Sequence, residues 1–511
     1  MAGSLPELVL RHFRADVPGH ALTVEGCSYS YSALGRMTRR LADDIEDRHG
    51  PLTGRPIAIA ASGSLTAYLA VLACLQLGAT YVPLDMTAPP DRVEDVLRRV
   101  APAAVVIDPR HLRRLPSFTA HAPTYDPMNA RWYGDAGSRS GVDPASPAPT
   151  PPRYVLFTSG STGTPKGIGI PDRCITAMFD AMAGIAPIAA EDRVAQAFEL
   201  TFDLAQYSTL ACWIAGAELV VMTPADRLRP ADFVRHHRVT YWFSVPSVAG
   251  FAEDTGDLTD ASMPSVRVSL FCGEALPGVL ATSWRSATAG APVWNLYGPT
   301  EATIACAAHR LADSGADDAG TVPLGRPFPG TSFAVLGGDG TPAPLRPGTT
   351  GELLIGGAQL FAGYLGDEAT TRAAFVAGTP GDGVGRWYRS GDRVRVGREG
   401  TVHFLGRVDE QVQVRGHRVE LREVELRIAQ GLGADPSRVV AVPLSGAHGT
   451  VDALGVAVAL PDVSDEHVRK VVVDRLPTYM VPRRVRTYDQ FPLNSNGKTD
   501  RPALRAALNR E

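Results

Sequence analysis

Residues 156–167 have the sequence LFTSGSTGTPKG, the strongest single signal in the chain. Seven consecutive Thr, Ser or Gly residues occupy positions 158–164, and Pro165, Lys166 and Gly167 follow. Small residues in series let backbone N–H groups approach a polyphosphate closely, and the hydroxyl groups add further donors. The stretch continues directly from the apolar, strand-like residues 154–157, which favours a phosphate-binding loop over the alternative of a flexible Ser/Gly-rich linker.

This loop differs from the two best-known phosphate-binding patterns. A Walker loop requires Gly directly before Lys and Ser or Thr directly after it, whereas here Pro165 precedes Lys166 and Gly167 follows it. The dinucleotide fingerprint GxGxxG is also absent from the stretch. Lys166 is one of only three lysines among 50 cationic residues, the others being Lys470 and Lys498. Lys498 also lies in a Gly-containing loop, where a compact ammonium on a flexible stem suits phosphate chemistry.

The bulk composition indicates a multidomain globular protein. With 511 residues, two to four domains or subdomains are expected. A net charge of −4 offers no basic surface for nucleic acid or an anionic membrane. The first twenty residues lack a signal-peptide pattern, and no apolar stretch reaches the roughly 18 residues of a membrane span, so we expect a cytoplasmic location.

Cysteine and histidine spacing argues against a metal site or disulfides. The six cysteines show no CxxC or Cys/His pattern, so buried free thiols are expected at Cys27, Cys74, Cys174, Cys212, Cys272 and Cys306. The pair His236 and His237 is flanked by arginines, and we interpret it as part of a solvated polar turn.

Hydrophobic periodicity predicts an α/β fold with largely parallel sheets in the first four hundred residues. Examples are strands at 56–61 and 104–107 and a helix at 65–77, and the Pro/Ser/Ala-rich residues 143–152 are expected to be an exposed linker. From Gly351, short strands with Gly and Asp turns predict a small β subdomain. A compact α+β tail follows, with strands at 411–415, 439–443 and 454–459, helices at 422–430 and 465–476, and a final loop. We therefore predict a core domain at 1–408 and a compact C-terminal domain at 409–511.

A set of ordered motifs gives the chain a family resemblance. The strongest are LFTSGSTGTPKG (156–167), NLYGPTEATI (295–304), YRSGD (388–392), GRVDEQVQVRGHRVE (406–420), LPTYMVP (476–482) and NSNGKTDR (494–501). Weaker matches lie at 67–85, 201–208 and 273–276. The set resembles the adenylate-forming enzymes, most closely the adenylation domains of nonribosomal peptide synthetases, and it covers nearly the whole chain. Nine motifs in the same order are far more specific than one Gly-rich loop.

The resemblance implies a site for ATP and Mg²⁺. It implies that Tyr297 stacks on adenine, that Thr300 donates to the α-phosphate and that Glu301 is the metal ligand, while Lys166 lies near the leaving group. Mg²⁺ suits a lone carboxylate because it keeps several waters and borrows phosphate oxygens. The implied nucleotide-binding residues are Thr158, Ser159, Gly160, Ser161, Thr162, Gly163, Gly273, Glu274, Ala275, Asn295, Leu296, Tyr297, Gly298, Asp392, Phe404 and Arg407. Taken alone, Glu301 could also offset a helix dipole and Asp392 could be a plain turn residue.

In the family, the C-terminal domain rotates between adenylation and thioester formation. The resemblance implies that Lys498 contacts the carboxylate and α-phosphate during adenylation, that Asp409 is the hinge, and that Gly416 meets the incoming thiol in the second state. Without the motif, Lys498 would be interpreted as a solvated turn lysine. Family members often carry Lys at Gln413 and Gly at Arg422, which puts the contacts of the thioester-forming state in doubt. Because the chain stops about ten residues after NGKTDR, we expect a stand-alone enzyme whose carrier protein acts in trans.

The resemblance also predicts a small amino acid as substrate. Asp203 matches the family's partner for the α-amino group, a contact worth about 1.5–3 kcal/mol, although an N-cap role is the alternative. The side-chain pocket aligns with Leu204, Tyr207, Ser247, Leu270, Cys272, Leu296, Ile304 and Ala305, with Lys498 closing it. Bulky residues here favour alanine, with serine, cysteine, glycine or proline as alternatives.

The predicted function is thus ATP-dependent formation of an aminoacyl-AMP and transfer to the phosphopantetheine thiol of a carrier protein. The sequence does not determine whether a small helper protein is also required. An acyl- or aryl-CoA ligase is the alternative within the superfamily, and a non-catalytic nucleotide-binding scaffold is the remote one.

Overall fold

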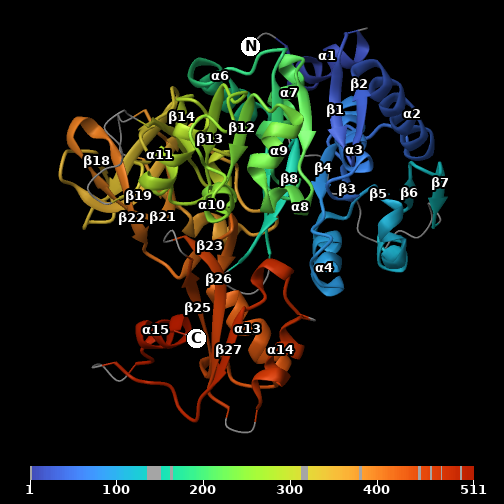
Figure 1. The fold of residues 1–511 in the computed structure, drawn as a ribbon. Helices are drawn as coiled ribbons and strands as arrows, with labels where there is room; N and C mark the ends of the chain where they lie inside the picture. The colour runs from blue at the N-terminus through green and yellow to red at the C-terminus, as the bar shows by residue number, and fades with distance from the viewer. Residues whose placement is uncertain are drawn as a thin grey trace.

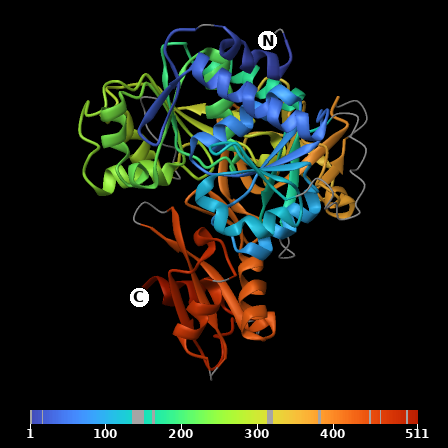
Figure 2. The same ribbon diagram turned by 90° about the vertical axis from the view of Figure 1, so that its right-hand side faces the viewer.

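The computed structural model describes residues 3–15, 17–134, 151–160, 165–311, 320–378, 383–446, 450–460, 463–473, 475–494 and 498–510 (Figure 1). A large unit contains the elements up to β22, and a smaller unit containing the elements from β23 onward lies below it in both views (Figures 1 and 2).

Two large sheets with mainly parallel strands organise the first three hundred residues. One contains β1 (His20–Val24), β2 (Cys27–Ser30), β10 (Arg193–Gln196), β11 (Glu218–Val221), β12 (Tyr241–Ser244), β13 (Val268–Phe271), β14 (Val293–Tyr297), β15 (Ala307–Arg310) and β16 (Arg326–Pro327), in the order β16-β15-β14-β13-β12-β10-β11-β1-β2. The other contains β3 (Pro56–Ala60), β4 (Thr80–Pro83), β5 (Ala104–Ile107), β6 (Thr124–Asp126), β7 (Arg131–Tyr133), β8 (Tyr154–Thr158) and β9 (Lys166–Ile170), in the order β7-β6-β5-β3-β4-β8-β9. The antiparallel pairs lie toward the sheet edges, and they include the hairpin of β8 and β9 that carries the Gly-rich loop.

Helices pack against both sheets. They are α1 (Leu5–Arg14), α2 (Tyr31–His49), α3 (Leu65–Leu77), α4 (Pro90–Val100), α5 (Leu115–Thr119), α6 (Asp172–Ile185), α7 (Asp203–Ala215), α8 (Pro224–Leu228), α9 (Pro230–His237), α10 (Pro246–Asp254) and α11 (Gly278–Ala287), with 3-10 turns η1 (Pro109–Arg114) and η2 (Thr300–Ala302). In α3, every residue except Gln76 is buried. A helix that is apolar on all sides must be enclosed, and α3 belongs to one continuous core with strands of both sheets.

A third, antiparallel sheet completes the large unit. Its strands are β17 (Thr331–Leu336), β18 (Pro342–Pro344), β19 (Thr350–Gly357), β20 (Phe375–Ala377), β21 (Arg386–Val396) and β22 (Val402–Arg407), with α12 (Glu368–Ala373) and η3 (Arg398–Gly400) between them. Strand β21 pairs with β19, β20 and β22, which places Asp392 in the middle of a strand and not in a turn.

The C-terminal unit has its own apolar cores. It contains the hairpin β23 (Gln411–Val414) and β24 (His417–Glu420), the strands β25 (Val439–Ser445), β26 (Val451–Val458) and β27 (Arg484–Thr487), and the helices α13 (Leu421–Leu432), α14 (Asp465–Val473) and α15 (Arg501–Arg510), with η4 (Pro436–Arg438) and η5 (Thr478–Met480). One apolar cluster holds α13 and α14 on this three-stranded sheet, and a second holds α15.

The α/β fold class predicted from the sequence is confirmed, and three local predictions are wrong. The chain does not end in a loop, because Asp500 accepts the Ala503 N–H at 2.9 Å and Leu504 and Leu508 are buried on one face of α15. His236 and His237 end helix α9 instead of forming a turn. Among the cysteines, Cys27 is exposed, because it lies on the edge strand β2.

Two further expectations concern the linker and membrane-spanning helices. Most of the expected linker, residues 143–150, is not described. In the part of the chain that is described, no helix is long and apolar enough to cross a bilayer.

Candidate active site

A cavity of about 760 Å³ lies between the two units, within the size range of about 300–1,000 Å³ that is common for ligand pockets. Its walls include the carboxyl ends of β8, β13 and β14. Ligands of open α/β sheets bind at this edge, because loops and helix starts gather there. The β23–β24 hairpin of the C-terminal unit forms another wall, with Gln413, Gly416, His417 and Arg418.

The start of the Gly-rich loop faces this cavity. The Thr158 hydroxyl is buried and has no hydrogen-bond partner among the described residues, so it is available to an entering ligand. The Ser159 hydroxyl donates to the Arg418 carbonyl at 2.8 Å, and Gly160 is buried. The predicted phosphate-binding residues Ser161, Thr162 and Gly163 lie outside the described residues. Lys166 begins β9 outside the cavity lining, and its ammonium lies 5.4 Å from the centre of the Tyr364 ring.

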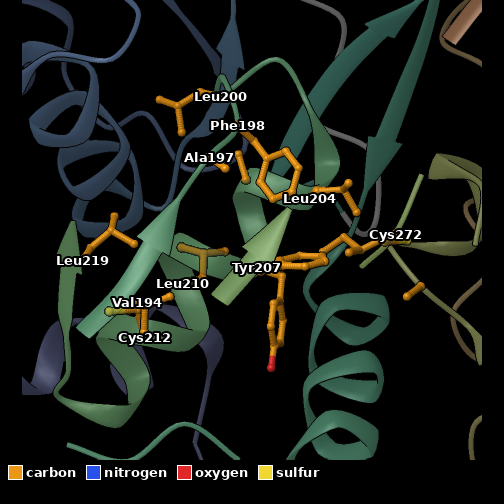
Figure 3. Close-up of a cluster of buried hydrophobic side chains, with 14 of the residues drawn as sticks. Val194, Ala197, Phe198, Leu200, Leu204, Tyr207, Leu210, Cys212, Leu219 and Cys272 are labelled. Atoms are coloured by element: carbon orange, nitrogen blue, oxygen red, sulfur yellow. The ribbon is translucent and has the colours of Figure 1, made fainter. Parts of the chain in front are cut away.

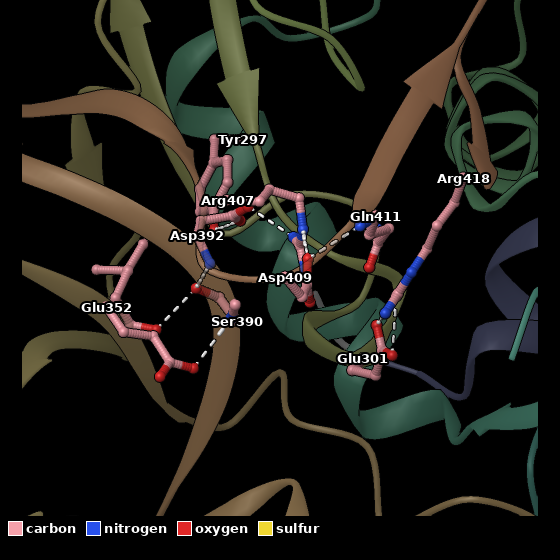
Figure 4. A network of polar contacts seen from close by, with 11 residues as sticks. Tyr297, Glu301, Glu352, Ser390, Asp392, Arg407, Asp409, Gln411 and Arg418 are labelled. Carbon is pink, nitrogen blue, oxygen red and sulfur yellow. Dashed lines mark hydrogen bonds and ion pairs between the residues drawn. The ribbon is translucent and has the colours of Figure 1, made fainter. Parts of the chain in front are cut away.

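A polar network joins the predicted ribose site to the predicted hinge (Figure 4). Asp392 accepts the Tyr297 hydroxyl at 2.5 Å and Arg407 Nη1 at 2.6 Å. The same guanidinium donates through Nε and Nη2 to both carboxylate oxygens of Asp409, at 2.6 and 2.7 Å. Burial raises the pKa of Asp392, although the Arg407 charge opposes that shift. Phe404 lines the cavity beside this network.

Glu301 is fully buried and bound on both oxygens by the C-terminal unit. Arg418 Nη1 lies 2.9 Å from Oε1 and 2.8 Å from Oε2 (Figure 4). The Tyr364 hydroxyl donates to Oε1 at 2.8 Å. Burial acts to raise the pKa of Glu301, but the Arg418 charge together with the hydrogen bonds that the carboxylate accepts holds the pKa below its ordinary value. The carboxylate is therefore ionised, and its partner here is a guanidinium.

The donor set around Glu301 fits Mg²⁺ only when nucleotide phosphates are also present. Among the described residues, no group of three or more His, Cys, Asp or Glu side chains could hold a metal by itself. Mg²⁺ is commonly held by one or two carboxylates together with phosphate oxygens and water. Glu301 can supply the one carboxylate, provided that Arg418 has withdrawn.

Asp203 is a buried acid on the cavity wall. It is the first residue of α7, whose N-cap is Phe202, so it does not cap the helix. Burial raises the pKa of Asp203 to about 6, while a hydrogen bond from the Thr300 side chain acts to lower it. Leu204, Cys272 and Leu296 line the cavity with it.

Other predicted pocket residues face elsewhere. Figure 3 shows Tyr207 extending away from Leu204, and its hydroxyl lies 2.8 Å from the Tyr241 hydroxyl. Ser247 donates from its backbone and its hydroxyl to Glu274, at 2.9 and 3.0 Å. The structure does not bring the following predicted residues to the cavity lining: Tyr207, Ser247, Leu270, Ile304, Ala305 and Asn295. The Asn295 amide donates instead to the carbonyls of Val322 and Pro323, at 3.2 and 2.8 Å.

Gly273, Glu274 and Ala275 do line the cavity. Burial raises the pKa of Glu274 to about 7, and the carboxyl group also accepts the Gly416 N–H of the hairpin. Gly416 has φ +81°, and a Cβ there would lie 2.6 Å from Val245 Cγ1. The turn therefore packs against the large unit with no room for a side chain.

Lys498 is not part of this cavity in the structure. It is exposed, and its backbone N–H donates to Asn494 Oδ1 at 3.1 Å within its own loop. The C-terminal unit thus presents the Gly416 turn to the cavity, while Lys498 lies outside the cavity lining.

Several residues at the site received no role from the sequence. Arg418 lies inside the quoted GRVDEQVQVRGHRVE motif, but its partner Glu301 is 117 residues away. His417 stacks on Tyr479 with ring centres 3.9 Å apart and meets the edge of Phe202 at 4.5 Å. The GRVDEQVQVRGHRVE motif indicates that these positions are functional, whereas the pairing of Arg418 with Glu301 is visible only in the tertiary structure.

Comparison with known proteins identifies the family. The AMP-binding enzyme family matches residues 12–365. The chain is 34% identical over 497 residues to the probable non-canonical nonribosomal peptide synthetase CymA of Salinispora arenicola, covering 96% of this chain and 6% of CymA. It is also 34% identical over 507 residues to the phosphinothricin tripeptide synthetase PhsC of Streptomyces viridochromogenes, covering 96% of this chain and 43% of PhsC. The chain thus spans less than half the length of these two relatives.

A solved structure matches over nearly the full length of both chains. The Vibrio cholerae adenylation domain AlmE, in complex with glycyl-adenosine-5'-phosphate, is 31% identical with a TM-score of 0.86, covering 99% of this chain and 98% of AlmE. The chain therefore belongs to the AMP-binding enzyme family, as an adenylate-forming ligase of the nonribosomal peptide synthetase type.

Proposed function

We propose that this chain activates a small amino acid with ATP and Mg²⁺ and then loads it on the phosphopantetheine thiol of a carrier protein. In the first step a carboxylate oxygen of the amino acid bonds to the α-phosphorus of ATP, and pyrophosphate leaves. In the second step the thiol sulfur bonds to the carbonyl carbon, and AMP leaves. Such chemistry depends mainly on positioning and on stabilising the charge that develops.

The observation that carries this proposal is Asp203, a buried carboxyl group on the cavity wall. A desolvated carboxylate is costly unless a partner compensates it, and a substrate ammonium is such a partner. A fatty or aryl acid would leave Asp203 without a cationic partner in a closed site. The residue therefore favours an amino acid over the substrates of an acyl- or aryl-CoA ligase.

The apolar side chains that share the cavity with Asp203 favour a small substrate. Leu204, Leu296 and Cys272 line the same cavity as the Asp203 carboxyl group. The AlmE complex contains a glycyl adenylate, which supports a small amino acid for this chain as well. Alanine is the first choice, followed by serine, cysteine, glycine and proline, because one methylene changes binding by only about 1–3 kcal/mol.

The nucleotide roles follow from the same placement. We assign the polyphosphate to the Gly-rich loop and to Lys166, the ribose hydroxyl groups to Asp392, and the α-phosphate to Thr300. Bound Mg²⁺ would supply charge neutralisation on the phosphates, with Glu301 as its protein ligand. Tyr297 and the 273–275 segment would border the adenine.

The two steps require two orientations of the C-terminal unit. The orientation seen here, with the Gly416 turn against the cavity, suits entry of a thiol. Adenylation requires the orientation that brings Lys498 to the carboxylate and α-phosphate. We propose that the units are 1–408 and 409–511, that they rotate about Asp409, and that the carrier protein is a separate partner. Hinges of this kind are a few residues that absorb large backbone changes.

An acid-dependent exchange of radiolabelled pyrophosphate into ATP tests the proposal. The panel should contain glycine, alanine, serine, cysteine, proline, leucine and phenylalanine, with propionate, benzoate and a fatty acid as des-amino controls. Exchange with a small amino acid and none with propionate is the expected result. Faster exchange with benzoate or the fatty acid would instead support a CoA ligase. ATP binding measured by calorimetry without exchange for any acid would support a non-catalytic scaffold.

A further inference from the structure

Helices α4 and α13, which belong to different units, meet through a buried ion pair. Arg92 Nη1 on α4 pairs with Glu423 Oε1 on α13, 331 residues away in the sequence. The Arg92 side chain is 9% exposed and the Glu423 side chain is 0% exposed. A second pair on the same helices, Arg427 with Asp91, is 3.6 Å apart, and its Asp91 side chain is 64% exposed.

The negative charge of the buried Glu423 carboxylate is compensated by Arg92. Its other oxygen, Oε2, is buried without a hydrogen-bond partner among the described residues. A buried carboxylate with a single cationic partner is destabilised strongly when that partner is removed. The same carboxylate in water needs no partner.

The pair also fixes the element that reaches the cavity. Glu423 lies in the first turn of α13, which directly follows β24 of the hairpin. Holding that turn against α4 therefore holds the hairpin, including Gly416 and the Arg418 contact with Glu301. Because α4 and α13 are on opposite sides of Asp409, a rotation at the hinge separates Arg92 from Glu423.

We infer that Arg92 and Glu423 are positioning residues for the thiol-transfer step, and that their pairing selects the orientation in which the Gly416 turn faces the cavity. This inference rests on the proposed two-step function. Neither residue takes part in adenylation, since that step uses the other orientation. The pair acts through the placement of the hairpin and not by touching the reacting atoms.

Single neutralisations test the pair. Arg92→Gln leaves the Glu423 carboxylate buried without a cationic partner, and it does so only in the present orientation. Glu423→Gln likewise leaves the Arg92 guanidinium buried without an anionic partner. Each variant should lower the kcat of carrier loading by about tenfold or more while pyrophosphate exchange stays within about threefold. Asp91→Asn is the matched control on the same two helices, and it should change both rates by less than about twofold because the Asp91 side chain is 64% exposed.

A double variant separates positioning from direct contact. Arg92 also lines the cavity, so its loss alone could reflect a missing substrate contact. Replacing both partners of a buried pair with apolar residues is often tolerated. Arg92→Met combined with Glu423→Leu should therefore recover most of the loading rate that either neutralisation loses. No recovery would overturn the pair as the cause.

Orientation should be measured independently of activity. Cys27 is the exposed native cysteine, and Ala506→Cys on α15 provides a second exposed site for a fluorophore pair. In the apo protein, the Arg92→Gln variant should show an energy-transfer efficiency different from that of the protein with the native pair. The double variant should restore the original efficiency. An unchanged distance together with slow loading would overturn the inference. Exchange that is absent even in the wild type would refute the proposed function instead.

Discussion

The sequence motifs around Gly416 and Lys498, both in the C-terminal unit, predict roles in the same chemistry. In the structure, however, the two residues have different surroundings. The Gly416 turn is packed into the large unit, through the Glu274 carboxyl group, Val245 and the neighbouring Arg418–Glu301 pair. Lys498 is exposed, and Leu493 is 64% exposed. Both belong to the C-terminal unit, whose strands β25 and β26 contribute to both of its apolar clusters. In this orientation Gly416 lines the cavity and Lys498 does not.

Under the proposed two-step function, that difference predicts that the two turns serve different steps. Residues of the cavity itself should serve both steps, whereas each turn should serve one. Variants of the two turns should therefore dissociate adenylation from carrier loading, and variants of the cavity should not.

The largest expected effect is that of Lys498→Ala. Removing a preorganised cation from the transition state costs about 2.7–4 kcal/mol, so exchange should fall by about 10²–10³-fold. ATP binding should survive, because the Gly-rich loop remains. Loading from a supplied aminoacyl adenylate should change much less, and near-normal exchange in this variant would refute the assigned role.

Asp203→Ala should slow both steps for every amino acid. The loss of a charge-assisted hydrogen bond of about 1.5–3 kcal/mol corresponds to roughly 10–150-fold in kcat/KM. Because the pKa of Asp203 is about 6, the carboxylate that binds an ammonium forms as the pH rises through 6. Wild-type kcat/KM for alanine should therefore fall below pH 6, and Asp203→Asn should remove that dependence. A pH profile shared by wild type and variant would contradict the contact.

Gly416→Ala should have the opposite pattern to Lys498→Ala, with carrier loading reduced more than pyrophosphate exchange. The new Cβ would meet Val245 Cγ1 at 2.6 Å, and a positive φ costs a non-glycine residue about 1–2 kcal/mol. We expect carrier loading to fall by about tenfold or more, with a smaller change in exchange. Gly433→Ala is the matched control, because its φ is +63° and nothing lies within 4 Å of the added Cβ. Equal losses in both variants would indicate backbone strain alone.

Asp409→Pro should restrict the C-terminal unit to one of its two proposed orientations. Proline fixes φ and removes one soft dihedral at the proposed hinge. The two half-reactions should then differ in their losses by about tenfold, equivalent to about 1.4 kcal/mol. Measuring exchange and loading on the same preparation provides the ratio, and equal losses would count against rotation at this residue.

The smallest expected effect is the change in selectivity of Leu296→Ala. Opening the cavity wall beside Cys272 should admit leucine or phenylalanine and weaken alanine by several-fold, since the substrate methyl loses packing partners worth about 1–3 kcal/mol. Exchange rates across the amino-acid panel measure the shift. A wild type that already prefers phenylalanine would show that the pocket assignment is wrong.

Local patterns were sufficient for much of the fold. The apolar run at 65–77 matches α3 because Gly78 adopts the left-handed conformation that ends a helix, and a Gly in this position is visible in the sequence. The helix α15 was missed because its evidence is tertiary, namely the burial of Leu504 and Leu508 against β25. Short amphipathic segments near a chain end give little local signal.

The sequence by itself determined the class of chemistry, because nine ordered motifs place small residues, carboxylates and lysines in a known arrangement. It also placed Asp203, Leu204, Cys272 and Leu296, which the structure brings to one cavity. Only the tertiary structure decided that Tyr207 and Leu270 face elsewhere, that Arg418 pairs with Glu301, and that Lys498 lies outside the cavity. The physical reason is that side-chain direction and ion pairing between distant residues depend on how whole elements pack, which no local pattern contains.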